Sequence, residues 1–263
     1  MRTLKLTVAY DGGRYVGWQR QASGESIQGL IEAALEVLEG RAVTVHGAGR
    51  TDAGVHALGQ VATAAVELRH DTGTILRALN AHLPPDIRIR AVDEMEADFH
   101  ARFSARRKTY RYLLRTGDVP SPFEHGFVWH LHEALEHSAM QTAAALLRGT
   151  HDFAGFRSTG ADVTTTIRTI HRSELVVGPV GSAPGGTSGP DDRAGGSLLV
   201  YEVEGDGFLR HMVRAIVGTL VDVGRRARPP ESIRDLLAAG ATRGQAGMTA
   251  PPHGLYLVAV DYD

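Results

Sequence analysis

Apolar and polar residues alternate near the start of the chain, from Leu4 to Tyr10, which is the pattern of a half-buried strand. Ser26 then precedes apolar residues at the spacing of one helical face, and Gly40 is expected to end that helix. Two strands, a short helix and another strand follow, predicted at Ala42 to Gly47, Leu58 to Val66, Thr72 to Asn80 and Ile87 to Val92. The first part of the chain therefore has the predicted order βαββαβ.

The second part of the chain repeats this order. The pattern predicts a strand at Lys108 to Arg115, a helix at Glu133 to Arg148, strands at Thr164 to Val177 and Ser197 to Glu204, a helix at Phe208 to Val223 and a last strand at Leu255 to Tyr262, with a short extra helix at Glu231 to Ala239. Two split βαββαβ units are typical of an α+β protein with a pseudo-duplicated, ferredoxin-like or RRM-like plan. We predict two lobes, residues 1–100 and 101–263, with mainly antiparallel sheets joined around a central cleft.

One stretch, Gly178 to Gly196, is composed almost entirely of small, polar and Pro residues and is unable to bury a core. It is predicted to be a flexible insertion between two strands. A phosphate-binding loop is the alternative, but no Gly-Lys-Ser/Thr motif follows it.

The composition limits the class of protein. With 263 residues, of which 43% are hydrophobic, the chain is long enough for one large domain or two lobes. The absence of Cys excludes disulfides, thiolate metal sites and cysteine nucleophiles. Neither a signal peptide nor a stretch of membrane-spanning length is visible, so we expect a cytoplasmic protein without a membrane anchor.

The net charge of −2 argues against a uniformly basic surface, so nucleic-acid binding would depend on a local patch. All but two of the 28 basic residues are arginine, which we attribute to a GC-rich genome. A cluster without any acidic residue does occur between Phe99 and Gly117, with cations at Arg102, Arg106, Arg107, Lys108, Arg111 and Arg115. This basic cluster is the candidate surface for an RNA backbone.

Three glycines lie within the eight residues from Gly47 to Gly54, and a cation, a hydroxyl and a carboxylate lie among them at Arg50, Thr51 and Asp52. A dinucleotide-binding fingerprint is excluded because Asp52 occupies the position of its third glycine. An active-site loop and a tight structural turn both fit this composition, and composition alone favours the turn.

Two further groups could contact a substrate. Tyr110 and Tyr112 alternate with arginines along a predicted strand, as in proteins that stack unpaired bases, although at least one of the two is expected to be a core residue. Arg210 and Arg214 are expected to share a helical face, where one could pair with a carboxylate. The spacing of the histidines fits no metal site, so we predict that no metal is bound.

Several motifs together resemble the TruA family of tRNA pseudouridine synthases over essentially the whole chain. They are Tyr10-Asp11-Gly12-Gly13 with Gly17-Trp18-Gln19-Arg20-Gln21, the loop Gly49-Arg50-Thr51-Asp52-Ala53-Gly54-Val55-His56-Ala57, Phe99-His100-Ala101-Arg102-Phe103-Ser104-Ala105 through Tyr110, His151-Asp152-Phe153, Phe208 to Arg214, and Gly247-Met248-Thr249-Ala250-Pro251 with Gly254-Leu255. The loop around Asp52 distinguishes this family from other pseudouridine synthases.

The resemblance implies a cofactor-free, homodimeric enzyme that converts uridines 38, 39 and 40 of the tRNA anticodon stem-loop to pseudouridine. It assigns Asp52 as the catalytic aspartate, Tyr110 as the residue that stacks on the target base, Arg214 as the partner of Asp52, and Arg50 as a residue that displaces the base. Arg210 stands where relatives often carry histidine and receives no role, and the insertion from Gly178 to Gly196 is longer than the equivalent turn.

Three chemical routes remain open for Asp52: attack on ribose C1′, addition to uracil C6, or removal of a proton from C2′. Two other classes of protein also remain as alternatives. A non-catalytic tRNA-binding protein would not need Asp52, and a glycosidic hydrolase would need a second carboxylate, which is not evident near the loop.

Overall fold

The structure is a computed structural model that describes residues 1–117, 119, 121–158, 164–178 and 196–262. Its contacts divide the chain into two compact units, Met1–Lys108 with Tyr256–Asp263, and Thr109–Leu255. The predicted lobes, 1–100 and 101–263, differ from these units mainly at the C-terminus. Tyr256–Asp263 belong to the first unit, where Tyr256 and Leu257 pair in parallel with His56 and Ala57.

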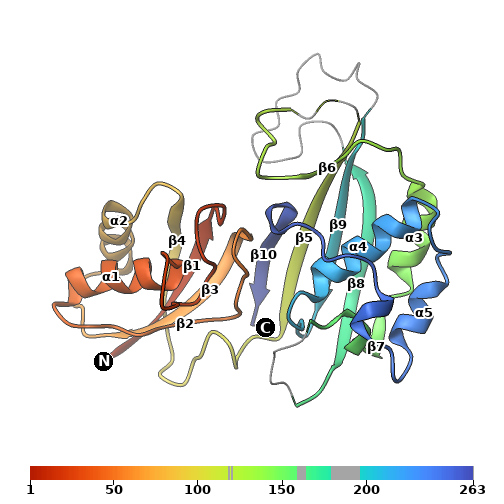
Figure 1. Cartoon of the computed structure of the whole chain (residues 1–263). Coiled ribbons are helices and arrows are strands. Elements are labelled where there is room, and N and C mark those ends of the chain that lie inside the picture. The colour runs from red at the N-terminus through yellow and green to blue at the C-terminus, as the bar shows by residue number, and fades with distance from the viewer. Residues whose placement is uncertain (118, 120, 159–163, 179–195, 263) are drawn as a thin grey trace. The chain divides into compact units, whose positions relative to one another are not determined.

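The first unit has the predicted βαββαβ order. Its elements are β1 (Arg2–Tyr10), α1 (Ile27–Glu39), β2 (Val45–Gly47), β3 (His56–Val66), α2 (Thr72–His82) and β4 (Ile87–Met95), with β10 (Leu255–Asp261) added from the C-terminus. The strands are ordered β4-β1-β3, and β2 pairs with β3; all three of these pairings are antiparallel. This order, with α1 and α2 packed side by side, is the ferredoxin-like arrangement (Figure 1).

Local sequence signals explain these elements well. Alternate residues of β1 are buried, with Leu4, Leu6 and Val8 completely enclosed. The Ser26 side chain accepts a hydrogen bond from the Gly29 amide and caps α1, and Gly40 ends the helix with a left-handed φ of 74°. The predicted boundaries of α1 are therefore confirmed.

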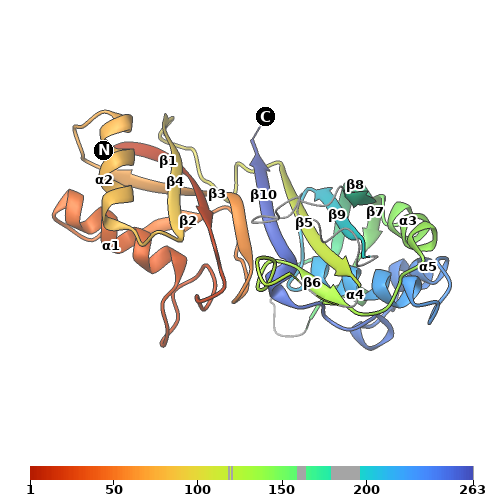
Figure 2. The ribbon, with the colours of Figure 1, turned by 90° about the horizontal axis from the view of Figure 1, so that it is seen from above.

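The described part of the second unit contains the remaining strands and the helices α3, α4 and α5. Its elements are β5 (Arg107–Thr116), β6 (Trp129–Leu131), α3 (His137–Ala145), β7 (Gly149–Asp152), β8 (Ile167–Gly178), β9 (Leu198–Gly205), α4 (Met212–Gly224) and α5 (Ser232–Leu237), with short 3-10 helices at Ala154–Phe156, Arg243–Gln245 and Pro252–Gly254. The strands are ordered β5-β9-β8-β7, and β6 pairs in parallel with β5. Helices α3 and α4 pack against each other, and α3 also packs on β8 (Figure 2). The predicted α+β class with mainly antiparallel strands is confirmed.

Several predicted details of the second unit are wrong. Helix α4 begins at Met212 instead of Phe208, because His211 adopts a left-handed conformation with φ of 60°. Arg210 therefore lies outside the helix and does not share a helical face with Arg214. Strands β6 and β7 were not predicted, because three or four residues give too short a pattern to recognise. Most of the predicted insertion, residues 179–195, lies outside the described residues.

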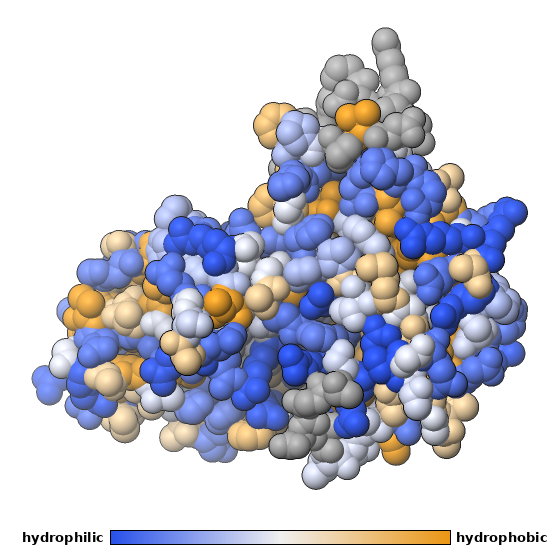
Figure 3. Space-filling model, viewed as in Figure 1, coloured by the Kyte–Doolittle hydropathy of each residue, from blue (hydrophilic) through white to orange (hydrophobic). Residues whose placement is uncertain are grey.

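The surface is predominantly polar on the face drawn in Figure 3, where hydrophobic residues form small, separated patches. None of the helices in the described ranges has both the length and the apolar character needed to cross a bilayer.

Candidate active site

Asp52 lies in the loop that connects β2 to β3 in the first unit. The first part of the loop runs alongside β3. The Ala48 amide donates a hydrogen bond to the Val61 carbonyl at 2.7 Å. The side-chain amide of Gln60, a residue of β3, donates to the Gly49 carbonyl at 2.9 Å. The segment that precedes Asp52 is thus held against the sheet by its own backbone.

Thr51, the residue before Asp52, is held in place by hydrogen bonds to two residues outside the loop. Thr51 is buried, and its hydroxyl lies 2.8 Å from the Tyr10 hydroxyl at the end of β1. The Thr51 carbonyl also accepts a hydrogen bond from the Trp18 amide at 3.0 Å. Burial raises the pKa of Tyr10 to about 12, so its phenol is neutral at physiological pH.

A tight turn follows Asp52. The Val55 amide donates to the Asp52 carbonyl at 3.1 Å, and Gly54 has φ of 78° at the third position of the turn. A positive φ at this position is the requirement of a type II turn, which favours glycine. The structural turn expected from composition is therefore present, and it is compatible with a catalytic role for Asp52.

The segment between β1 and α1 packs against this loop so closely that it requires glycine. A Cβ atom on Gly12 would lie 2.0 Å from the Val55 carbonyl oxygen, and one on Gly17 would lie 2.6 Å from the Thr51 carbonyl oxygen. The Gly12 amide also donates to Nδ1 of His56 at 3.1 Å. The pattern of hydrophobic and polar residues does not mark Gly12 or Gly17 as site residues, although both belong to motifs that resemble the TruA family.

Tyr110 lies on β5 in the second unit and is buried. Its ring meets the ring of Phe208 edge-on, with centroids 5.0 Å apart. Tyr112 is completely buried and donates its hydroxyl to the Pro251 carbonyl at 2.7 Å. Tyr112 is therefore a core residue, as expected for at least one of the two tyrosines.

Arg214 lies in the first turn of α4. The segment that contains Ala250 packs against this turn and fixes the position of Arg214. Its Nε donates to the Ala250 carbonyl at 2.7 Å, and the Ala250 amide donates back to the Arg214 carbonyl at 3.1 Å. This close approach depends on Gly218, where a Cβ atom would lie 1.8 Å from the Met248 carbonyl oxygen. The protein backbone thus holds one edge of the guanidinium group.

The basic cluster divides into two parts. Arg102, Arg106 and Arg107 are exposed, and Lys108 is half-buried, with its Cε 3.6 Å from the position of a Cβ on Gly49. These four cations lie in the first unit, and Lys108 lies beside the loop that carries Asp52. The other two are paired within the second unit, Arg111 with Glu202 at 2.8 Å and Arg115 with the buried Glu124.

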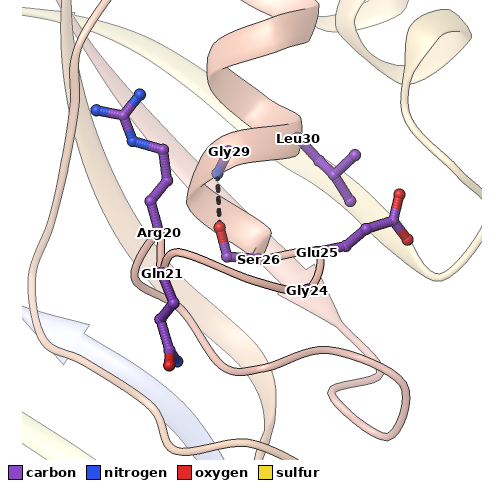
Figure 4. A pocket seen from close by; sticks show the side chains of 7 residues that line it. All are labelled: Arg20, Gln21, Gly24, Glu25, Ser26, Gly29 and Leu30. Carbon is purple, nitrogen blue, oxygen red and sulfur yellow. Dashed lines mark hydrogen bonds between the residues drawn. The ribbon is translucent and has the colours of Figure 1, made fainter.

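A hollow of about 220 Å³ opens at the start of α1 (Figure 4) and contains neither Asp52 nor Arg50. Its lining residues are Arg20, Gln21, Gly24, Glu25, Ser26, Gly29 and Leu30. The Ser26 side chain is used to cap α1, and the carboxylate of Glu25 lies 4.0 Å from the Arg14 guanidinium. The hollow therefore offers no second candidate site.

Histidines do not form a metal centre in the described part of the chain, where no three His, Cys, Asp or Glu side chains are grouped to hold an ion. His130 instead makes a 2.6 Å hydrogen bond to the Gly117 carbonyl, and its ring contacts that of His132 edge-on.

Comparison with known proteins decides the family. The family model described as tRNA pseudouridine synthase matches residues 6–104 and 143–263, which include Asp52 with its loop, Arg214 and the last strand. The chain belongs to the tRNA pseudouridine synthase family.

Relatives within this family match over the whole of this chain. The chain is 42% identical to tRNA pseudouridine synthase A of Moorella thermoacetica, with all of both chains covered. It is also 42% identical to the enzyme of the same name from Geobacter sulfurreducens, again over all of both chains, and 43% identical to that of Chloroflexus aurantiacus, where it covers 89% of the relative. A crystal structure of an archaeal box H/ACA sRNP Nop10-Cbf5 complex matches 83% of this chain and 44% of the other at 11% identity, with a TM-score of 0.33.

Proposed function

We propose that this protein isomerises uridine to pseudouridine in tRNA and that Asp52 is its catalytic carboxylate. Membership of the tRNA pseudouridine synthase family over nearly the whole chain carries the proposal. The loop around Asp52 supports the choice of residue, because backbone and side-chain hydrogen bonds hold it on both sides of the carboxylate.

The reaction breaks the bond from ribose C1′ to uracil N1, turns the uracil while it stays bound, and joins C1′ to uracil C5. The hydrogen on C5 leaves as a proton, and a proton is gained at N1, so the balance includes no oxidant or reductant. One ionised carboxylate is sufficient, and no cofactor or metal is required. Attack at C1′, addition at C6 and proton removal at C2′ all remain compatible with a carboxylate at position 52.

We assign the supporting roles to residues of both units. Arg50, exposed next to Asp52, would displace the target base from its stack, and Tyr110, whose ring is held edge-on by Phe208, would stack on that base. Arg214 would pair with Asp52 and keep it ionised, since a neighbouring cation favours the charged form of a carboxylate. The hydrogen bond from Arg214 Nε to the Ala250 carbonyl supports this role because it fixes the orientation of the guanidinium group.

The proposed substrate is the anticodon stem-loop, with uridines 38, 39 and 40 as targets. Removing a base from its stack costs a few kcal/mol, which contacts to the phosphates can offset. Arg102, Arg106, Arg107 and Lys108 would supply those contacts. We also propose that the enzyme works as a cytoplasmic homodimer without membrane attachment.

Product analysis tests this function. An unmodified tRNA transcript with uridine at positions 38–40 is incubated with the protein, digested to nucleosides and analysed by chromatography with mass detection. We expect pseudouridine in amounts that fall when each target uridine is replaced by cytidine. Binding without any product would favour the non-catalytic tRNA-binding protein, and release of free uracil would favour the glycosidic hydrolase.

A further inference from the structure

The turn from His100 to Ser104 exposes a large aromatic side chain in the first unit. Phe103 has 76% of its surface accessible, whereas Ala101, two residues earlier, is completely buried. An isolated apolar side chain on a surface is common, but exposing an apolar ring of this size to water is unfavourable in free energy. Its surroundings therefore decide whether the exposure has a function.

The turn that carries Phe103 is rigid. Ser104 closes it twice, since its amide donates to the His100 carbonyl at 2.9 Å and its hydroxyl accepts from the His100 amide at 3.1 Å. The Arg102 amide donates to Nδ1 of His100 at 3.1 Å. The turn is also fixed to the sheet, because the Ala101 amide donates to the Thr63 hydroxyl at 2.7 Å and the Ala101 carbonyl accepts from the Tyr262 hydroxyl at 2.8 Å. Phe103 is thus presented outward by a well-supported backbone.

Two groups lie against the Phe103 ring, His100 and Arg102, and His46 lies against His100. His100 lies with its ring centre 4.5 Å from that of Phe103, and the ring of His46 lies 5.2 Å from that of His100. The guanidinium carbon of Arg102 lies 5.5 Å from the centre of the Phe103 ring. Burial, together with the neighbouring His46, lowers the pKa of His100, so its imidazole is neutral near pH 7 and fits an aromatic contact.

This group is directly connected to the loop that carries Asp52. His46 pairs with Thr63 in the β2–β3 ladder, and β2 ends one residue later, where the loop begins. The exposed cations Arg106 and Arg107 follow Phe103 in the chain, and Lys108 reaches Gly49 within the loop. The nearest acidic residues upstream of the turn are the exposed Asp98 and Glu96, and beyond them Glu94 and Asp93 are paired with Arg2 and Lys5.

We propose that Phe103 is a stacking platform for an unpaired base of the RNA, placed beside the catalytic loop and flanked by Arg102 and the exposed cations. The inference rests on the proposed function in taking tRNA as the partner. An exposed aromatic ring among arginines matches what single-stranded RNA offers, a flat base face and a negative backbone. The base held there is distinct from the target uridine, for which Tyr110 in the second unit is the proposed partner.

Binding measurements with labelled, unmodified tRNA at constant salt test the proposal. Phe103→Ala should raise Kd by about 5- to 100-fold, and Phe103→Trp should stay within about 3-fold of wild type, because both aromatic rings stack on a base. Phe123→Ala is the matched control, since Phe123 is similarly exposed at 66% but lies in the second unit next to Glu124. An unchanged Kd for Phe103→Ala, or an equal loss in the control, would overturn the proposal.

The Phe103→Trp variant also gives a direct signal. The two native tryptophans, Trp18 and Trp129, are buried, so the additional emission comes from an exposed indole. Stacking of a base should quench this emission when tRNA is added, by an amount that wild type does not show. No quenching at saturating tRNA would contradict the proposal.

Two outcomes separate this inference from its alternatives. If wild type binds tRNA but makes no pseudouridine, the proposed function fails while the Kd series still tests Phe103.

Light scattering after size exclusion reports the mass of wild type and Phe103→Ala; an unchanged mass is expected. A lower mass for the variant would assign Phe103 to an interface between two copies of the chain and overturn the RNA platform.

Discussion

The hydroxyl groups of Tyr10 and Thr51 lie 2.8 Å apart in the interior of the first unit, one residue before Asp52. This contact connects the end of β1 to the loop that carries the proposed catalytic group. Because both side chains are buried, neither hydroxyl can exchange its partner for bulk water. The position of Asp52 therefore depends on a core hydrogen bond as well as on the loop.

Loss of this hydrogen bond should destabilise the protein. Thr51→Val preserves the shape of the side chain but leaves the Tyr10 hydroxyl with only the 3.5 Å contact to Gln60, and should lower the free energy of unfolding by about 1–3 kcal/mol. Tyr10→Phe should act similarly. The double variant should lose clearly less than the sum of the two, which urea unfolding of all four proteins can measure. Strictly additive losses would show that the contact contributes nothing.

Alkaline pH should destabilise the protein through the same tyrosine. Burial raises the pKa of Tyr10 from 10 to about 12. Below pH 10 the phenol is neutral in both states; between pH 10 and 12 it ionises in the unfolded chain but not in the folded one, so stability falls as pH rises. Each such tyrosine should contribute a loss of about 2–3 kcal/mol over this range. The Tyr10→Phe variant should show a shallower decline in urea unfolding measured from pH 9 to 12, and an identical slope would contradict this assignment.

Substitution at Gly12 should disturb the loop selectively. A Cβ at this position would lie 2.0 Å from the Val55 carbonyl oxygen, so Gly12→Ala must displace the backbone, with a cost of about 1–3 kcal/mol and a strong loss of turnover. Gly13→Ala is the matched control, because its Cβ would meet only the Asp11 side chain, at 3.1 Å. Thermal unfolding and single-turnover rates of the two variants should differ clearly; equal behaviour would refute the proposed packing.

The salt dependence of tRNA binding should distinguish the two parts of the basic cluster. Arg106→Gln removes an exposed cation and should reduce the slope of log K against log salt by about 1. Arg111→Gln should leave the slope unchanged, because Arg111 is already paired with Glu202 at 2.8 Å. Titrations at four salt concentrations give both slopes. A reduced slope for Arg111→Gln would show that this ion pair opens to bind RNA.

Periodic elements could be predicted from the sequence because their signals are local. The strand from Leu4 and the helix after Ser26 each carry a hydrophobic period, and Ser26 and Gly40 mark the ends of the helix by their own capping preferences. The order of elements in the first unit followed from these signals. The fold class, this order and the ends of α1 could be predicted in this way.

Features that depend on distant contacts could not be predicted. No local signal shows that His211 has a left-handed backbone, and this conformation moved the start of α4 past Arg210. Likewise, Arg111 is neutralised by Glu202, a residue 91 positions away. Close packing of Gly12 against Val55 is invisible in a sequence pattern for the same reason.

The role of Asp52 illustrates the same limit. Composition favoured a structural turn, and the structure contains that turn, with Gly54 at its positive φ. The hydrogen bonds around Thr51 explain how such a turn can hold a carboxylate in a fixed position. Its assignment as the catalytic group came from the motifs shared with the family, and it remains the central prediction.

Release of tritium from tRNA labelled at uracil C5 tests that prediction most directly, since the new C1′–C5 bond forms only if C5 loses its hydrogen. Asp52→Asn preserves size and removes the charge, and circular dichroism with a tRNA binding measurement confirms that the variant is folded and binds substrate. We predict release with wild type and a loss of at least about 1,000-fold with Asp52→Asn, as expected for a group that takes part in the covalent step. Release at the wild-type rate from Asp52→Asn would contradict the account.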